Sequence, residues 1–139
     1  GYTIKSSSAK VAVATDMGEI TKEVKAEVVG SDLVILESNH DLEMLKLGSY
    51  PWHLKKRVMS ENGHLSNDDA GSFAVKLAQN SVQCILLAHL SQDNNVPELA
   101  FLTIKNMLVE AGIEPGEDME LSFAYQDQVS ELYHLSKEE

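Results

Sequence analysis

The feature that most constrains this chain is a short apolar strand that ends in an acidic residue, Lys10-Val-Ala-Val-Ala-Thr-Asp-Met-Gly18. Residues 11–15 are small or β-branched, which favours a buried strand. Asp16 ends the apolar run, and Gly18 supplies a flexible turn. In open α/β sheets, ligands bind at the carboxyl ends of the strands. Asp16 therefore either caps the turn or helix that follows or contributes to a functional site at that edge.

The same pattern of an apolar strand followed by polar residues occurs twice more. Leu33-Val-Ile-Leu36 leads into Glu37-Ser-Asn-His-Asp41, and Cys84-Ile-Leu-Leu-Ala88 leads into His89-Leu-Ser91. If these strands run parallel to the first, they deliver an aspartate, a glutamate and histidines to one edge of a sheet.

Helical patterns separate these strands, which predicts an α/β fold with several parallel strands. Residues 2–4 and 10–15 are predicted to form a hairpin through the polar loop Ser6-Ser-Ser8. The acidic tail of the chain is predicted to fray. Helices are predicted over residues 19–29, 42–47, 52–59, 68–79 and 98–111, and further strands over 82–88 and 119–124.

Length and charge narrow the class of protein. A chain of 139 residues predicts one domain. Its 22 acidic and 11 basic residues give a net charge of −11, which argues against non-specific binding of nucleic acid by this chain unaided. The charge fits either a cytosolic surface or a metal site whose cations offset part of the excess. Cys84, the single cysteine, is predicted to be a buried and inert thiol, so no disulfide framework forms within one chain. No apolar run or leader indicates a membrane span or a signal peptide, which predicts a cytoplasmic protein.

Four histidines lie in or near loops that the predicted strands bring together. His89 follows an apolar strand and is either a metal ligand or a histidine bonded to backbone. His64 lies between a glycine and a helix start, as either an acid–base residue or a structural loop residue. His40 is a ligand, an acid–base partner or a turn residue. His53 belongs to His-Leu-Lys-Lys-Arg57, the one basic cluster, which is either a solvated helix face or a contact for a phosphate backbone.

Taken together and in order, five motifs resemble those of the metallo-β-lactamase-fold hydrolases, and in particular the YycJ/WalJ-type branch. That branch is related to RNA 3′-end-processing and DNA-repair nucleases. Each motif alone is weak, but the order and spacing are specific, and the resemblance extends from Gly1 to about Leu132. The motifs are Thr15-Asp-Met-Gly18, Glu37-Ser-Asn-His-Asp41, Tyr50-Pro-Trp-His-Leu54, Gly63-His-Leu-Ser-Asn67 and Ala88-His-Leu-Ser91.

The resemblance implies an αββα sandwich that holds two divalent metal ions at one edge of its sheets. Residues 1–139 would form the C-terminal half of that domain, a mixed β-sheet flanked by helices. The resemblance implies that Asp16 bridges the two ions and that His89 is the final metal ligand. It implies that His64, with Glu37 as its partner, acts on the leaving group. We also expect a second group of residues in the same motifs to contact the substrate: His40, Ser66 and Asn67.

The chain also departs from the family pattern. The family's first signature, His-x-His-x-Asp-His, is absent from this sequence, as is the further histidine that normally precedes the bridging aspartate. Asp16 and His89 supply two protein ligands, fewer than the usual three or four of a zinc site. We therefore expect the chain to be cut from a longer enzyme and to be inactive alone. We also expect it to pair with the missing N-terminal half or with itself.

Three functional hypotheses follow. The first is a dinuclear metal-dependent hydrolase, with Zn²⁺ or Mn²⁺, that acts as a phosphodiesterase on DNA or RNA through a metal-bridging water. The second keeps the fold but changes the substrate to an ester, thioester or lactam. The third is a non-catalytic α/β interaction module in which Asp16, His64 and His89 are structural residues.

Overall fold

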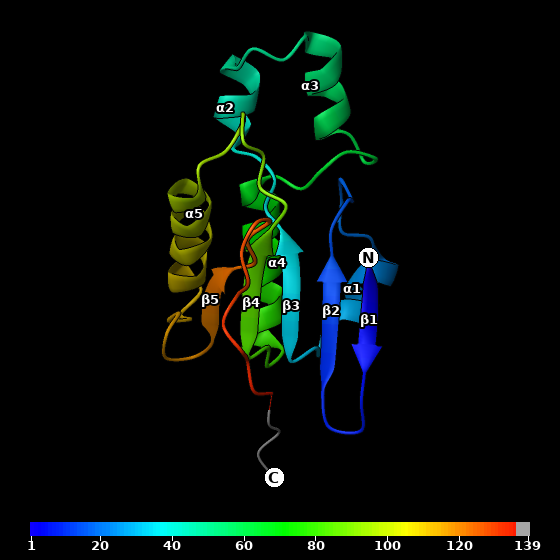
Figure 1. The fold of residues 1–139 in the computed structure, drawn as a ribbon, viewed down its shortest axis with the longest axis vertical. Coiled ribbons are helices and arrows are strands. Elements are labelled where there is room, and N and C mark those ends of the chain that lie inside the picture. Colours follow the sequence, from blue (N-terminus) through cyan, green and yellow to red (C-terminus); the bar gives the residue numbers. More distant parts are fainter. Residues whose placement is uncertain (136–139) are drawn as a thin grey trace.

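The three apolar stretches form the centre of a five-stranded mixed sheet in the computed structural model, which describes residues 1–135. The strands are β1 (Tyr2–Lys5), β2 (Lys10–Ala14), β3 (Leu33–Glu37), β4 (Cys84–Ala88) and β5 (Glu120–Phe123). They lie in the order β1-β2-β3-β4-β5 (Figure 1). β1 pairs antiparallel with β2, and the other pairs are parallel. The carboxyl ends of β2, β3 and β4 therefore meet at one edge, which confirms the predicted α/β class.

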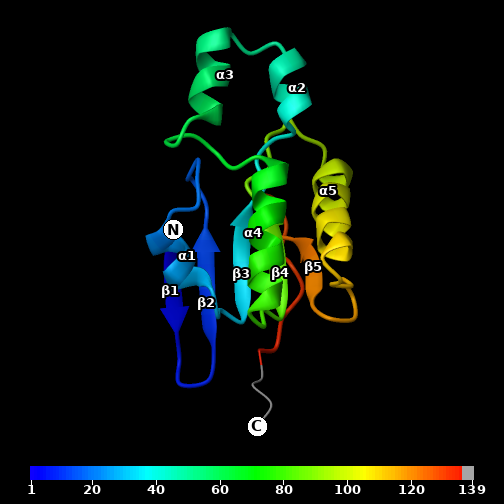
Figure 2. The same ribbon diagram turned by 180° about the vertical axis from the view of Figure 1, so that it is seen from behind.

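The helices divide into two groups. α1 (Lys22–Val28), α4 (Asn67–Gln79) and α5 (Pro97–Glu110) cover one face of the sheet (Figure 2). α2 (Leu42–Leu47) and α3 (Trp52–Met59) instead project beyond the carboxyl edge of the parallel strands (Figure 1). The second pair consequently overhangs the edge at which the polar motifs gather.

Side-chain alternation along the strands gives the sheet two apolar faces. The helix-covered face holds the main core, where Leu36, Ile85 and Leu87 are fully buried. The opposite face carries a smaller cluster around Leu33 and Leu86. No helix covers that face within residues 1–135. It is covered in part by side chains of the C-terminal segment: Ala124, Tyr133 and Leu135.

Most predicted elements match the structure to within one or two residues. α1 is the main exception, because it begins at Lys22 and not at Glu19. Thr21 is its N-cap and accepts a hydrogen bond from the Val24 backbone N–H at 3.2 Å, so the preceding residues stay outside the helix. The tail, predicted to fray, forms no regular element after β5 but follows the sheet face to Leu135. Its last four residues lie outside the described range.

The structure bears on two further predictions, those for the cysteine and for membrane spans. Cys84 is buried in β4, which confirms its predicted burial. Burial raises the pKa of its thiol to about 12, which favours the predicted inert thiol. Over residues 1–135, every helix is too short or too polar to cross a membrane. The cytoplasmic location stays a prediction.

Candidate metal centre

Four potential metal ligands converge at the carboxyl edge of the sheet. Asp16 follows β2, Glu37 ends β3 and His89 follows β4. His64 reaches the same place from the loop between α3 and α4. One ligand atom from each of these four residues lies within 4.8 Å of the others. The structure thus brings together the residues for which the sequence predicted metal binding and acid catalysis.

Glu37 lies at the centre of this cluster and is fully buried. Its Oε1 lies 2.9 Å from His64 Nδ1 and also contacts His89 Nδ1. Its Oε2 accepts a hydrogen bond from the Leu65 backbone N–H at 3.2 Å. Because a carboxylate only accepts hydrogen bonds, each imidazole presents its Nδ1–H to Glu37 and keeps Nε2 free for other chemistry. One buried carboxylate therefore orients two histidine rings, whose centroids are 5.1 Å apart.

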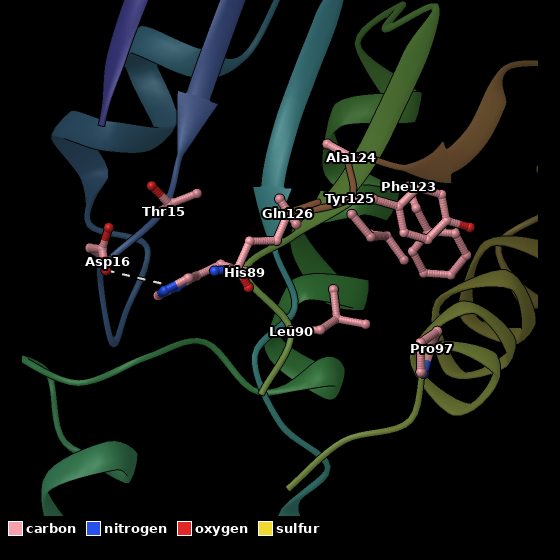
Figure 3. Close-up of a pocket in the computed structure, with 11 residues that line it drawn as sticks. Thr15, Asp16, His89, Leu90, Pro97, Phe123, Ala124, Tyr125 and Gln126 are labelled. Atoms are coloured by element: carbon pink, nitrogen blue, oxygen red, sulfur yellow. Dashed lines mark ion pairs between the residues drawn. The ribbon is translucent and has the colours of Figure 1, made fainter. Parts of the chain in front are cut away.

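Asp16 and His89 share an uncommon backbone conformation. Their φ angles are 61° and 57°, in the left-handed region that few non-glycine residues adopt. Such a conformation costs on the order of 1–3 kcal/mol and gathers at functional sites. The turn at each position keeps the side chain beside the cluster, where Asp16 Oδ1 lies 3.8 Å from His89 Nδ1 (Figure 3). Asn39 steadies the second turn, because its side-chain amide donates to the His89 carbonyl at 2.9 Å.

Ser66 and Asn67, predicted to contact the substrate, are buried behind the cluster. The Ser66 hydroxyl caps α4. The Asn67 amide donates to Asn95 Oδ1 at 2.9 Å, and Asn67 Oδ1 accepts from the Ser38 hydroxyl at 2.6 Å. Asn67 thus joins α4 to the loops after β3 and β4. Their contact with a substrate stays a prediction.

His40 is buried as well, and its Nδ1 lies 3.3 Å from Asn39 Oδ1. Burial lowers the pKa of His40, and the nearby His64 lowers it further. A histidine with a pKa below its ordinary value is neutral at pH 7. Of the alternatives that the sequence left open, this environment favours a residue that supports the loop. Its contact with a substrate, like that of Ser66 and Asn67, stays a prediction.

Sequence reasoning missed the asparagines and the serine that support the site. Asn95 donates to the Ser38 carbonyl at 2.9 Å, and Asn39 links the loops after β3 and β4. The one available signal was their position directly after apolar strands or before a helix. Buried amides in such loops satisfy backbone groups that a strand no longer pairs.

Two hollows of about 380 Å³ each meet at His89. One extends from Asp16 and His89 towards Phe123 and Tyr125 (Figure 3). The other lies beneath the overhanging helices and includes Asn39, Tyr50 and His64 in its lining. The cluster is therefore open to ligands from both sides.

The donor set suits a divalent transition metal. Two imidazoles and two carboxylates are ligands that zinc and manganese sites use. The sequence predicted two ligands from this chain, Asp16 and His89, whereas four donors lie close enough to share ions. Glu37 is paired with both histidines, so Glu37 and His64 serve equally well as an acid–base pair beside an ion.

No family model matches the chain. It is similar to the protein named exodeoxyribonuclease YycJ of Bacillus anthracis, with 38% identity over 120 residues that make up 86% of this chain and 46% of the relative. It is also similar to the protein named exodeoxyribonuclease WalJ of Streptococcus pneumoniae, in serotype 2 strain D39 and in strain R6. That identity is 39% over 107 residues, which are 77% of this chain and 40% of each relative. The chain spans less than half the length of these curated relatives. Over most of its own length, it is homologous to part of the YycJ/WalJ exodeoxyribonucleases.

Proposed function

We propose that residues 1–139 are the C-terminal half of a metallo-β-lactamase-type αββα domain, and that the complete protein is a metal-dependent phosphodiesterase that removes nucleotides from DNA. The observation that carries the proposal is the convergence of Asp16, Glu37, His64 and His89 within 4.8 Å. The names of the relatives, which are called exodeoxyribonucleases, support DNA over other phosphodiesters.

Asp16 and His89 would hold the metal, with the remaining ligands contributed by the N-terminal half. Bound Zn²⁺ or Mn²⁺ supplies Lewis acidity towards a phosphate and lowers the pKa of water. Asp16 suits a shared ligand because a carboxylate has two oxygens, and its side chain is exposed at the strand end. The uncommon backbone turns at both residues support these roles, because such conformations gather at functional sites.

His64 would protonate the leaving oxygen. Glu37 holds the Nδ1 of His64, so the ring is oriented and Nε2 carries the transferable proton. Histidine suits this role because its charge changes near neutral pH. Because Glu37 is fully buried, water does not compete for its hydrogen bond to His64, and the ring stays oriented.

The test uses the complete gene product, not this chain alone. The metal content of the purified protein is measured first. Nucleotide release is then measured on end-labelled single- and double-stranded DNA and on RNA, and hydrolysis is measured on a panel of acyl esters, thioesters and lactams. We expect metal-dependent release from DNA, and we expect Asp16→Ala to lose both bound ions and nearly all activity. Ester or lactam hydrolysis without DNA cleavage would favour the second hypothesis. A protein that binds no metal and cleaves nothing would favour the interaction module.

A further inference from the structure

The hollow between the candidate metal centre and β5 has walls of different chemistry. Asp16 and His89 form its polar end, and Phe123 and Tyr125 form its aromatic end (Figure 3). Pro97, the first residue of α5, belongs to the apolar lining. The hollow therefore reaches from potential metal ligands to an aromatic surface within a single volume of about 380 Å³.

The aromatic end is built as a stack. Phe101 of α5 lies 5.9 Å from Phe123 of β5, measured between ring centroids. Tyr125 stacks on Phe123 at 5.5 Å with an interplanar angle of 28°. Phe101 and Phe123 pack against the main core, whereas Tyr125 is 49% exposed. The stack thus begins in the core and ends on a ring that is accessible to a ligand.

Charge and stacking together indicate which ligand this hollow accepts. Among residues 1–135, no lysine or arginine side chain lines the hollow, so the part of it that suits an anionic group is the metal centre. A flat, uncharged ring fits the aromatic end, and a phosphate fits the metal end. A nucleotide carries both groups on one sugar. Base stacking on aromatic side chains also tolerates any sequence, because every base has a π-face.

We infer that this hollow binds the base of the nucleotide whose phosphate lies at the metal centre, with the base against Tyr125. The inference rests on the proposed function and adds to it a base-binding subsite that does not read sequence. The Gln126 amide and the Thr15 hydroxyl, which also line the hollow, are positioned to hydrogen-bond the sugar or the base edge.

The test compares two ligands that differ only in the base. Binding of dAMP and of 2-deoxyribose 5-phosphate to the zinc-loaded complete protein is measured by calorimetry. We expect dAMP to bind roughly 5- to 150-fold more tightly, the usual contribution of one stacked base. Tyr125→Ala should remove most of that difference and leave the sugar phosphate affinity unchanged. Tyr125→Phe should retain it, and Leu102→Ala, at an exposed residue of α5 outside the hollow, serves as the control.

Equal affinities for the two ligands would overturn the inference, as would an unaltered preference for dAMP in Tyr125→Ala or no binding of dAMP at millimolar concentration. These results leave the proposed function standing if DNA is still cleaved with metal. Failure of the proposed function is a separate result, seen as loss of DNA cleavage by the unmodified protein.

Discussion

At the residue scale, burying the Glu37 carboxylate away from water costs free energy, and its hydrogen-bond partners offset that cost. A buried charge is unfavourable unless it is paired and hydrogen-bonded. Glu37 has three partners: His64, His89 and the Leu65 backbone. Neither histidine is itself fully buried, so each ring is oriented from the inside and accessible from the outside. This arrangement suits a site in which the buried Glu37 positions the two partly exposed histidines for chemistry.

His64 gives the first prediction, in the complete protein. His64→Ala should leave metal content intact and lower turnover by roughly 10²- to 10⁴-fold, because it removes a positioned acid and not a ligand. Metal analysis and single-turnover DNA cleavage measure the two effects. His134→Ala, at an exposed histidine with no assigned role, is the control. Loss of metal together with turnover would make His64 a ligand.

His40 gives a prediction on pH. Burial and the nearby His64 lower the pKa of His40 in the folded state, whereas in the unfolded chain it is near 6.5. Below that pH the unfolded state binds more protons, so His40 should destabilise the fold progressively as the pH falls from about 6.5. Urea unfolding between pH 8 and 5 should show a steeper loss of stability in the unmodified chain than in His40→Gln. Equal slopes for the two proteins would contradict this.

At the element scale, local patterns were sufficient to predict the strands and most helices. Apolar runs followed by polar residues located the ends of β2, β3 and β4, because parallel strands align their carboxyl ends. The start of α1 was wrong by three residues, since Thr21 is a better cap than the pattern indicated. The approach of His64 to Glu37 depends on the path of the loop before α4, which no local periodicity records. Only the family resemblance predicted that pair.

The burial of Ser66 and Asn67 was also beyond local prediction. Their position in a motif indicated a place near the site but not on which side of the loop each side chain lies. Burial depends on how α4 packs against the loops after β3 and β4, which is a tertiary property. The supporting amides, such as Asn95, were missed for the same reason.

α3 provides a prediction about the basic cluster. Lys55 is withdrawn from solvent, and its ammonium donates to the Lys46 carbonyl at 2.6 Å. Lys56 and Arg57 remain exposed on a helix that projects beyond the carboxyl edge (Figure 1). If both contact single-stranded DNA, replacing both with alanine should reduce the slope of log K against log salt by about 1.4. Binding measured across a salt series gives the slope.

The matched control for α3 is Lys5→Ala combined with Lys76→Ala. Both lysines are exposed, and both lie near the opposite end of the sheet, because Lys5 pairs with Lys10 at the start of β2 and Lys76 is in the last turn of α4. This double variant removes the same charge without altering α3. An equal change of slope in both double variants would assign the effect to net charge, and the basic cluster would then be a solvated helix face.

At the scale of the whole molecule, the two faces of the sheet are covered unequally. Within residues 1–135, three helices bury one face, whereas the other is covered in part by the segment after β5. Tyr2 and Ile4 lie on this second face, opposite Val13 and Val11 in the pairing of β1 with β2. They are 62% and 60% exposed. β1 is also an edge strand, with one row of backbone groups unpaired within the sheet.

This partly covered face predicts association. Monomers rarely expose contiguous apolar patches beyond roughly several hundred Å², so we expect the isolated chain to self-associate or to bind a separate chain that carries the first half of the domain. Ile4→Glu, which places a charge on the face, should weaken association measured by sedimentation. Leu102→Glu, at an exposed position on the outer side of α5, should not.

Adding the separately produced N-terminal half should convert the assembly to a one-to-one complex and restore metal-dependent DNA cleavage. A stable monomer that does not bind the N-terminal half would show that this face needs no partner. The proposal that the chain is the C-terminal half of the domain would then be wrong.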